Sequence, residues 1–276
     1  MKVITVSRSY GSAGTLFAKR LADVLGFKYA DETLIAKMNK ADGILNSLAI
    51  KEEDEENEPG FFEKVAELAS NRSFFKVALE TFIYDLALKG NLVFVGGGAH
   101  IILRGYPGLF SIQIVRNTED RINAIAAEKK ISIDEASELV RKKDKHKANF
   151  ISYYFDVDLF DHTMFHLTFN ASLVDIDEAV NMVVNHVNNM SVSAEDEVFL
   201  KKRLIESKAQ LLLFSLDLTH KAKIIFDAQE EGVLIAKGVV GNKHKKEEVL
   251  AALNRLPEVS KVVDQIKIEV LSRIIY

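Results

Sequence analysis

The first 26 residues hold the feature that most constrains the fold: a short β-branched run, a glycine-containing turn and then apolar residues at helical spacing. Residues 3–6 (Val-Ile-Thr-Val) predict a buried strand, and apolar residues in 16–25 recur every three or four positions. Gly26 is a natural C-terminal stop for the helix that this spacing predicts. The segment therefore predicts a strand, a loop and a helix in that order.

The same order recurs further along the chain. Residues 92–95 predict a strand that runs into three consecutive glycines at 96–98, and apolar residues follow at 101–103. Residues 111–115 predict another strand. Strands that alternate with helices indicate an α/β fold with a parallel sheet flanked by helices.

Two helices later in this region carry capping signals. Ser132 followed by Glu135 is a capping box, and Asp175 with Glu178 precedes a helix whose valines lie on one face. The α/β pattern ends near residue 190, where Asn188 and Asn189 interrupt it. We therefore expect a parallel-sheet α/β domain over residues 1–190.

The remainder of the chain follows a different pattern. Ser193 is the expected cap of a long helix that reaches about residue 214. Strands are then predicted at 224–226, 232–240 and 262–270, with a helix before the last of them. Residues 191–276 are thus expected to form a linker helix and a small α+β domain of order β-β-α-β.

Composition excludes several classes of protein. The chain contains no Cys, which removes disulfides, thiolate metal sites and Cys nucleophiles and fits a reducing compartment, so we expect a cytoplasmic protein. No stretch has the length and apolarity of a signal peptide or a membrane span. A net charge of −4 disfavours general binding to nucleic acid. The acidic run at 52–58 is expected to be a solvated loop.

The loop at residues 9–16 stands where a phosphate loop belongs, because it follows the first strand and opens the first helix. A complete P-loop ends in Gly-Lys-Ser/Thr, whereas Thr15 and Leu16 occupy the last two places here. Taken alone, these residues fit a tight turn without a ligand equally well.

Several segments together resemble the cytidylate kinase-like family, a branch of the P-loop nucleoside-monophosphate kinases. These segments comprise residues 4–35, 92–115, 118–125, 131–155 and 165–183. They are similar to that family in order and spacing over about residues 1–188. The resemblance implies a P-loop kinase core, ATP as phosphoryl donor with Mg²⁺, CMP or a similar monophosphate as acceptor, and a mobile basic lid.

The resemblance also assigns roles to individual residues. The catalytic cations of the lid are Arg141, Lys145 and Lys147. The ATP-phosphate loop comprises Gly11, Ser12, Ala13, Gly14 and Thr15. The monophosphate site includes Asp31 and Gly97, with Arg121 beside the adenine. Arg8 and Arg104 are not assigned by the resemblance; they are the nearby cations that would replace the missing phosphate clamp of the monophosphate site. Simpler explanations stay open: a solvated helix end for the lid cations, a cap for Asp31 and a surface ion pair for Arg121.

This chain departs from the family pattern where phosphates should bind. It has Ala-Gly-Thr at 13–15 where the family commonly has Gly-Gly-Arg, and Gly97 at the centre of a usual Gly-Arg-Gly. Lys147 stands where the family favours Arg, so the charge is kept while bidentate geometry is lost. Lys19, one turn beyond Thr15, is a substitute cation or simply a surface lysine.

Other features give weaker signals. His162 and His166 are four residues apart, but no third ligand accompanies them, so no metal site is predicted. Residues 232–240 and 257–268 resemble a BON-type module, which implies a protein or ligand partner for the C-terminal domain.

Two functions follow from these observations. The first is transfer of the ATP γ-phosphoryl group to CMP or a similar nucleoside monophosphate. The second is a catalytically degraded, kinase-like nucleotide sensor that acts through its C-terminal module. The missing cations at Thr15 and Gly97 separate the two, because phosphoryl transfer depends on positioning and charge neutralisation. A scaffold that binds no nucleotide is the third possibility.

Overall fold

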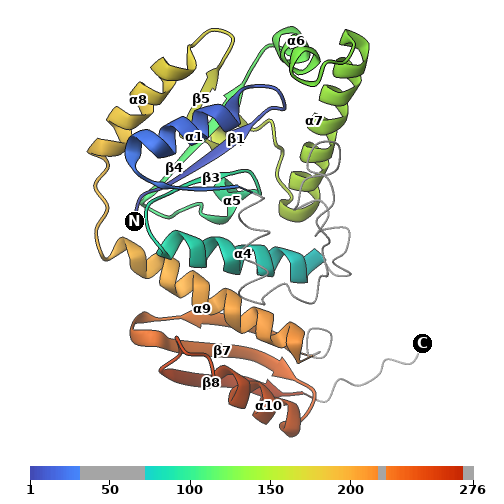
Figure 1. Cartoon of the computed structure of the whole chain (residues 1–276). Helices are drawn as coiled ribbons and strands as arrows, with labels where there is room; N and C mark the ends of the chain where they lie inside the picture. Colours follow the sequence, from blue (N-terminus) through green and yellow to red (C-terminus); the bar gives the residue numbers. More distant parts are fainter. Residues whose placement is uncertain (32–71, 217–221, 270–276) are drawn as a thin grey trace, which may run out of the picture. The chain divides into compact units, whose positions relative to one another are not determined.

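The computed structural model describes residues 1–31, 72–216 and 222–269 (Figure 1). The chain divides into two compact units, one within residues 1–72 and 89–193 and the other within residues 73–88 and 194–276. The acidic run at 52–58 lies outside the described residues. None of the described helices has the length and apolarity needed to cross a membrane.

The first unit is built on a five-stranded sheet whose strands all run parallel, in the order β2-β3-β1-β4-β5. The strands are β1 (Val3–Arg8), β2 (Lys28–Ala30), β3 (Leu92–Val95), β4 (Leu109–Val115) and β5 (Leu167–Asn170). β1 is central because its apolar run is buried almost throughout, as expected for a strand covered on both faces. The predicted parallel α/β fold is confirmed.

Five helices and one 3₁₀ turn accompany this sheet in the described part of the first unit. They are α1 (Gly14–Leu25), α5 (Ala99–Ile102), α6 (Thr118–Lys129), α7 (Ile133–Phe155), η1 (His162–Met164) and α8 (Ile176–Asn189). The predicted end signals are confirmed: Gly26 caps α1 with φ 63°, the Ser132–Glu135 capping box opens α7, and Asp175 accepts from the first amides of α8.

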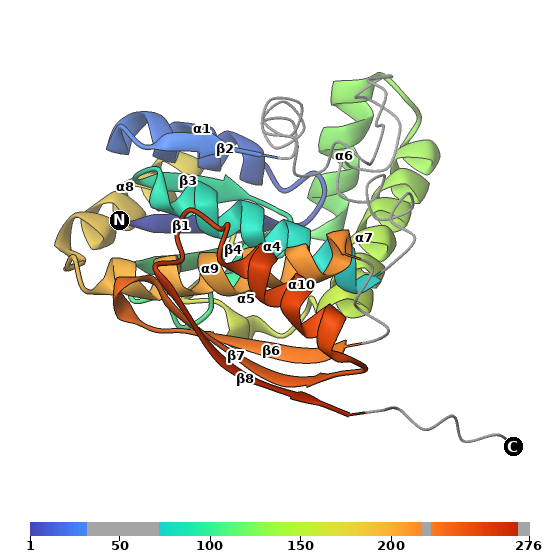
Figure 2. The ribbon, with the colours of Figure 1, turned by 90° about the horizontal axis from the view of Figure 1, so that it is seen from below.

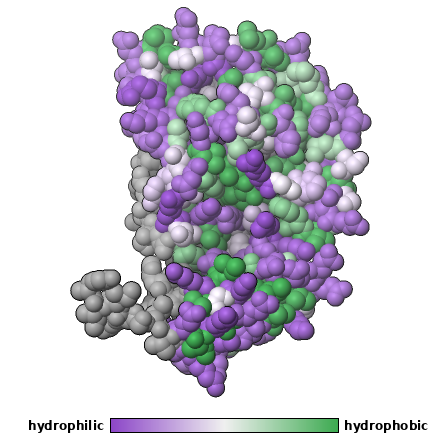
Figure 3. Space-filling model, turned by 180° about the vertical axis from the view of Figure 1, so that it is seen from behind, coloured by the Kyte–Doolittle hydropathy of each residue, from purple (hydrophilic) through white to green (hydrophobic). Residues whose placement is uncertain are grey.

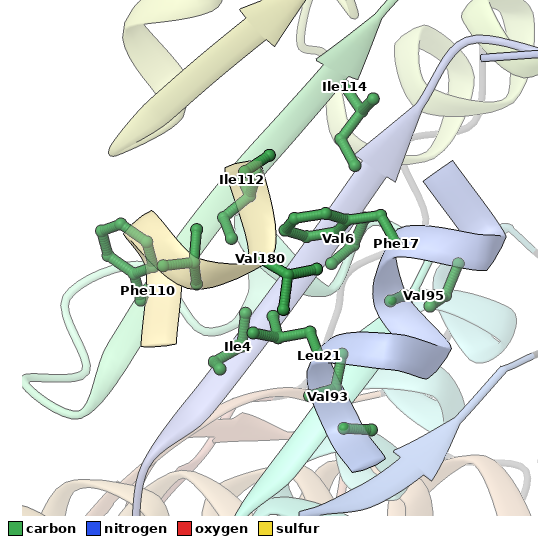
Figure 4. Packing of buried hydrophobic residues seen from close by; sticks show 14 of the residues in the cluster. Ile4, Val6, Phe17, Leu21, Val93, Val95, Phe110, Ile112, Ile114 and Val180 are labelled. Carbon is green, nitrogen blue, oxygen red and sulfur yellow. The ribbon is translucent and has the colours of Figure 1, made fainter. Parts of the chain in front are cut away.

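One face of the sheet packs against α1 and α8 (Figure 4). Ile4 and Val6 of β1 meet Phe17 and Leu21 of α1, and Val180 of α8 joins the same cluster. Further aromatic packing comes from Phe169 of β5, whose ring centroid lies 5.3 Å from that of Phe17. This packing fixes the direction of α1, and so the position of the loop that precedes it.

The second unit contains a three-stranded sheet of order β6-β7-β8 (Figure 2). Its elements are α4 (Arg72–Leu88, grouped here from residue 73), α9 (Asp196–Ser215), β6 (Ala222–Ala228), η2 (Glu230–Gly232), β7 (Val233–Val240), α10 (Lys243–Leu253) and β8 (Lys261–Ile268). β6 and β7 are antiparallel, and α10 connects β7 to its parallel neighbour β8. The predicted β-β-α-β order is confirmed.

Two details of the second unit differ from the prediction. The long helix begins at Asp196 with Glu195 as its cap position, so the expected cap at Ser193 is wrong. Residues 73–88 group with this unit although they precede residue 190 by a wide margin. Phe74 packs edge-on against Phe214 at 5.5 Å, which joins α4 to α9. The division into domains at residue 190 stays a prediction.

The surface of the protein carries both hydrophilic and hydrophobic residues. Hydrophilic residues are spread over the whole face seen in Figure 3, with smaller hydrophobic patches between them. This mixture is ordinary for a folded chain, because apolar atoms make up much of any protein surface.

Candidate active site

A cavity of about 620 Å³ lies in the first unit, beyond the carboxyl ends of β1 and β3. Its walls come from the end of β1, the loop at 9–13, the first turn of α1, the glycines at 96–98, and residues of α6 and α7. Open parallel sheets characteristically bind ligands outside the carboxyl ends of their strands. The cavity is therefore the candidate active site.

The loop between β1 and α1 directs the N-terminus of α1 into this cavity. Gly11 and Ala13 both have positive φ, 76° and 60°, which turns the chain sharply before α1 begins at Gly14. A Cβ atom on Gly14 would lie 2.4 Å from the Cβ atom of Arg8, so only glycine fits there without movement of the backbone. The result is a helix N-terminus whose first amides have no acceptor within the helix.

Ser12 adds a second polar group to the same loop. Its side chain is only 1% exposed, and its hydroxyl has no hydrogen-bond partner among the described residues. Buried polar groups are nearly always satisfied, so an unpaired hydroxyl in a cavity wall is available to a ligand or a water molecule. Together with the helix amides, Ser12 makes this loop suitable for an anion.

Within the described ranges of the chain, three cationic side chains line the cavity: Arg8, Lys143 and Lys147. The Lys147 ammonium reaches from α7 to the end of β1, where it donates to the backbone oxygen of Arg8 at 2.6 Å and to the Ser7 hydroxyl at 3.2 Å. Lys143 lies one turn earlier on α7. The prediction omitted Lys143, although its i, i+4 spacing from Lys147 is a signal that places both on one helix face.

The Arg121 side chain has a structural role beside the cavity, because it bonds to neighbouring elements. Its side chain is 8% exposed, and Nη1 donates to Asp144 Oδ2 at 2.6 Å and to the Tyr10 backbone oxygen at 3.2 Å. The other Asp144 oxygen accepts from the Tyr10 amide at 3.2 Å. Arg121 and Asp144 thus tie the loop between β1 and α1 to α6 and α7. Arg121 is not among the residues lining the cavity, so the surroundings of this side chain do not match the expected position beside an adenine.

The structure brings together only part of the predicted site. Arg8, Gly97, Lys147 and residues 11–15 line the cavity. Arg141 pairs with Glu138 on the exposed side of α7, and Lys145 is also exposed. Asp31 follows β2 and is absent from the cavity wall. The Lys19 ammonium lies 5.7 Å from the Tyr29 ring centroid instead of leaning toward Thr15.

Arg104 is also separated from the candidate active site. It lines a second, smaller cavity together with His166 and other residues. The two predicted histidines do not form a pair on a helix, because His162 lies in the short turn η1 and His166 precedes β5. His162 bonds to Gln113 and His166 bonds to Ser111, and no group of three or more metal-ligating side chains occurs among the described residues.

His100 is a cavity residue that the sequence patterns did not indicate. It follows glycines 96–98, all with positive φ, and a Cβ atom on Gly98 would lie 2.5 Å from the Phe155 ring. This close approach of α7 leaves His100 only 6% exposed. Burial, together with the charge of Lys147, lowers the pKa of His100 to about 3. The imidazole is therefore neutral at physiological pH.

The depressed pKa of His100 predicts a pH-dependent stability. Below about pH 6.5 an unfolded chain binds a proton at His100 that the folded chain excludes, so the free energy of unfolding falls as the pH falls toward 3. Between about pH 6.5 and pH 5 this single group should cost the wild type about 2 kcal/mol. His100→Gln should lose correspondingly less stability in urea titrations at the two pH values. Parallel losses in the two proteins would contradict the assignment.

Among the described residues, the cavity lacks the usual P-loop hydroxyl that holds Mg²⁺. Leu16 stands at the place of the P-loop hydroxyl and supplies no oxygen. In the part of the chain that the structure describes, the wall carboxylates belong to Glu128 and Asp144, and Asp144 already accepts from Arg121 and Tyr10. A Mg²⁺ ion in this cavity would consequently depend on nucleotide phosphates for most of its ligands.

Comparison with known proteins adds a direct observation. The model of the cytidylate kinase-like family matches residues 3–173, which is more than half of the chain. The chain belongs to the cytidylate kinase-like family. This match spans all five strands of the parallel sheet and every residue that lines the candidate active site. The resemblance noted from the sequence is thereby confirmed, and the BON-type resemblance of the C-terminal region stays a prediction.

Similar proteins agree with the family assignment. A cytidylate kinase from Saccharolobus islandicus is 27% identical over 207 residues, covering 75% of this chain and all of that protein. One from Staphylothermus marinus is 23% identical over 184 residues, covering 66% and 94%. The crystal structure of an uncharacterized protein from Eubacterium ventriosum covers 68% of this chain and 98% of its own with a TM-score of 0.53 at 20% identity. This last likeness concerns the fold alone.

Proposed function

We propose that this protein binds ATP with Mg²⁺ and transfers the γ-phosphoryl group slowly to CMP or a similar nucleoside monophosphate. The observation that carries the proposal is one cavity in which the N-terminus of α1, the unpaired Ser12 hydroxyl and the Lys147 ammonium occur together. Membership in the cytidylate kinase-like family supports the choice of substrates.

The part of the cavity that would bind ATP, the phosphoryl donor, retains positive charge although the loop at residues 11–15 contains no Lys or Arg. The amides of the first turn of α1 would hold the ATP phosphates, as helix N-termini commonly do. Arg8, Lys143 and Lys147 would neutralise their charge from the surrounding walls. Since phosphoryl transfer depends on positioning and electrostatic stabilisation, Lys147 is the side chain most suited to act on the transferred group.

The acceptor phosphate has fewer cationic side chains available to bind it than the ATP phosphates have. Gly97 offers no side chain, and Arg104 lines another cavity, so Arg8 is the arginine left in the active-site wall to contact an acceptor phosphate. Loss of one preorganised charge donor typically costs about 10²–10³ in rate. We therefore expect turnover well below the roughly 1–100 s⁻¹ of typical kinases.

A turnover comparison tests this proposal. The wild type is compared with Thr15→Lys and with the double variant Thr15→Lys/Gly97→Arg in a coupled assay with saturating ATP, Mg²⁺ and CMP. Thr15 is exposed at the cavity and accepts a longer side chain, so Thr15→Lys alone should raise turnover. Gly97 has φ 61°, so arginine there carries backbone strain of about 1–2 kcal/mol, and the double variant should gain less than expected from charge alone.

The outcomes of that comparison separate the candidate functions. Wild-type turnover at the full rate of a kinase would show that the substitutions at Thr15 and Gly97 are not damaging. ATP binding without turnover in any variant would instead favour the nucleotide sensor, a function that the bare Gly97 position also fits. Absence of ATP binding would exclude both.

We also propose a cellular compartment and binding partners for this protein. A chain without cysteine suits the cytoplasm, where nucleotides are available. The second unit would serve as a binding module for a protein or small ligand. It has a hydrophobic core of its own, and the residues of that core do not line the catalytic cavity. No binding to nucleic acid is expected at a net charge of −4.

A further inference from the structure

The second cavity of the first unit has a volume of about 390 Å³ and shares His100 with the active site. It lies between the connection from α5 to β4 and the segment that leads into β5. The residues of interest in its wall are His100, Arg104, Tyr106, Ser111, Phe165 and His166. Its volume is within the range of small-molecule sites.

Arg104 supplies the cavity with an available guanidinium group. Its side chain donates from Nη1 to the Met164 sulfur at 3.3 Å and forms no ion pair with any described residue. A thioether is a weak acceptor, whereas a guanidinium has five donors in a planar fork that matches a carboxylate. Asp161 is near enough for the Arg104 charge to help lower its pKa, but its carboxylate accepts from the Thr163 amide and hydroxyl.

Two imidazoles with different hydrogen bonding also line this cavity. His166 Nδ1 accepts from the Ser111 amide at 3.0 Å and lies 2.7 Å from the Ser111 hydroxyl, so the ring proton resides on Nε2. His100 forms no hydrogen bond with a described residue, although it is 6% exposed. Its ring stacks on Phe165 with 4.5 Å between centroids. The His100 ring nitrogens are therefore available to a ligand or a water molecule in the two cavities that this residue lines.

We propose that this cavity binds a small organic acid carrying one negative charge, at a site distinct from the nucleotide cavity. The carboxylate is received by the Arg104 fork, and the apolar body of the ligand lies against Phe165 and Tyr106. One cation and neutral imidazoles match a monoanion, and the carboxylate of Asp161 disfavours a doubly charged phosphate. The site does not depend on kinase activity.

Titration of the full chain with benzoate tests the site, because benzoate combines one carboxylate with a flat apolar ring. We expect binding with a Kd of about 1 mM. Arg104→Gln should weaken it by roughly tenfold or more, as for loss of a charge-assisted hydrogen-bond pair. Arg255→Gln removes the same charge from an exposed position in the second unit and should leave the affinity unchanged.

Two further titrations locate and define the ligand. Saturating ADP with Mg²⁺ should not displace benzoate competitively, and inorganic phosphate should bind Arg104 more weakly than benzoate does. Equal benzoate affinity in the wild type and Arg104→Gln would overturn the proposal, as would competitive displacement by ADP. Absence of benzoate binding up to about 10 mM would overturn it as well.

Discussion

Lys147→Ala should reduce the kcat/KM for ATP by about 10²–10³, whereas Lys145→Ala should change it by no more than about threefold. Both lysines lie on α7 and are only two residues apart. Lys147 faces the cavity and contacts the end of β1, while Lys145 is exposed and does not line the cavity. Comparing the two variants therefore distinguishes the effect of a positive charge inside the cavity from the effect of the overall positive charge of α7.

Lys147→Arg completes this experiment. It restores a charged donor that can contact two phosphate oxygens, so activity should return to at least the wild-type range. Thermal unfolding of each variant controls for loss of structure, because Lys147 also bonds to the backbone oxygen of Arg8. Equal losses in Lys145→Ala and Lys147→Ala would contradict the role given to Lys147.

Gly14→Ala should abolish measurable ATP binding and lower the free energy of unfolding of the first unit by about 1–3 kcal/mol. The added Cβ atom would lie 2.4 Å from Arg8 Cβ and 2.9 Å from Arg8 Cγ. Neither atom is the far end of a flexible side chain, so β1 or the loop must move. That movement should displace the amides that we propose to bind the phosphates.

Gly241→Ala is the matched control for this substitution. Nothing lies within 4 Å of a Cβ atom at Gly241, and its φ is not positive, so stability should change by less than about 0.5 kcal/mol. ATP affinity should also be unchanged. Wild-type ATP affinity in Gly14→Ala would show that the loop between β1 and α1 does not hold the phosphates.

Local patterns in the sequence sufficed for the fold of the first unit. A buried strand, a glycine-containing turn and an amphipathic helix are adjacent in the chain, so their residues determine one another's conformation. The capping box at Ser132 and Glu135 fixed the start of α7, and Gly26 the end of α1. The loop between β1 and α1 could be located for the same reason.

Contacts between distant residues could not be read from the sequence. Asp144 lies 134 residues from Tyr10 and 23 from Arg121, and only the packing of α6 and α7 against the loop joins the three. Likewise, nothing in residues 73–88 indicates that they group with the C-terminal unit. Arg104 was expected to replace the cation missing at Gly97, yet it follows α5 and lines another cavity.

We propose above all that nucleotide phosphates bind the loop at residues 11–15, in the cavity that Lys147 also lines. Amide NMR spectra recorded during titration of the full chain with ADP and Mg²⁺ test it most directly. The largest shifts should fall on Gly11, Ser12, Gly14 and Thr15, and Lys147→Ala should weaken the affinity by roughly tenfold or more. Saturable ADP binding that leaves these four amides unchanged would contradict the claim.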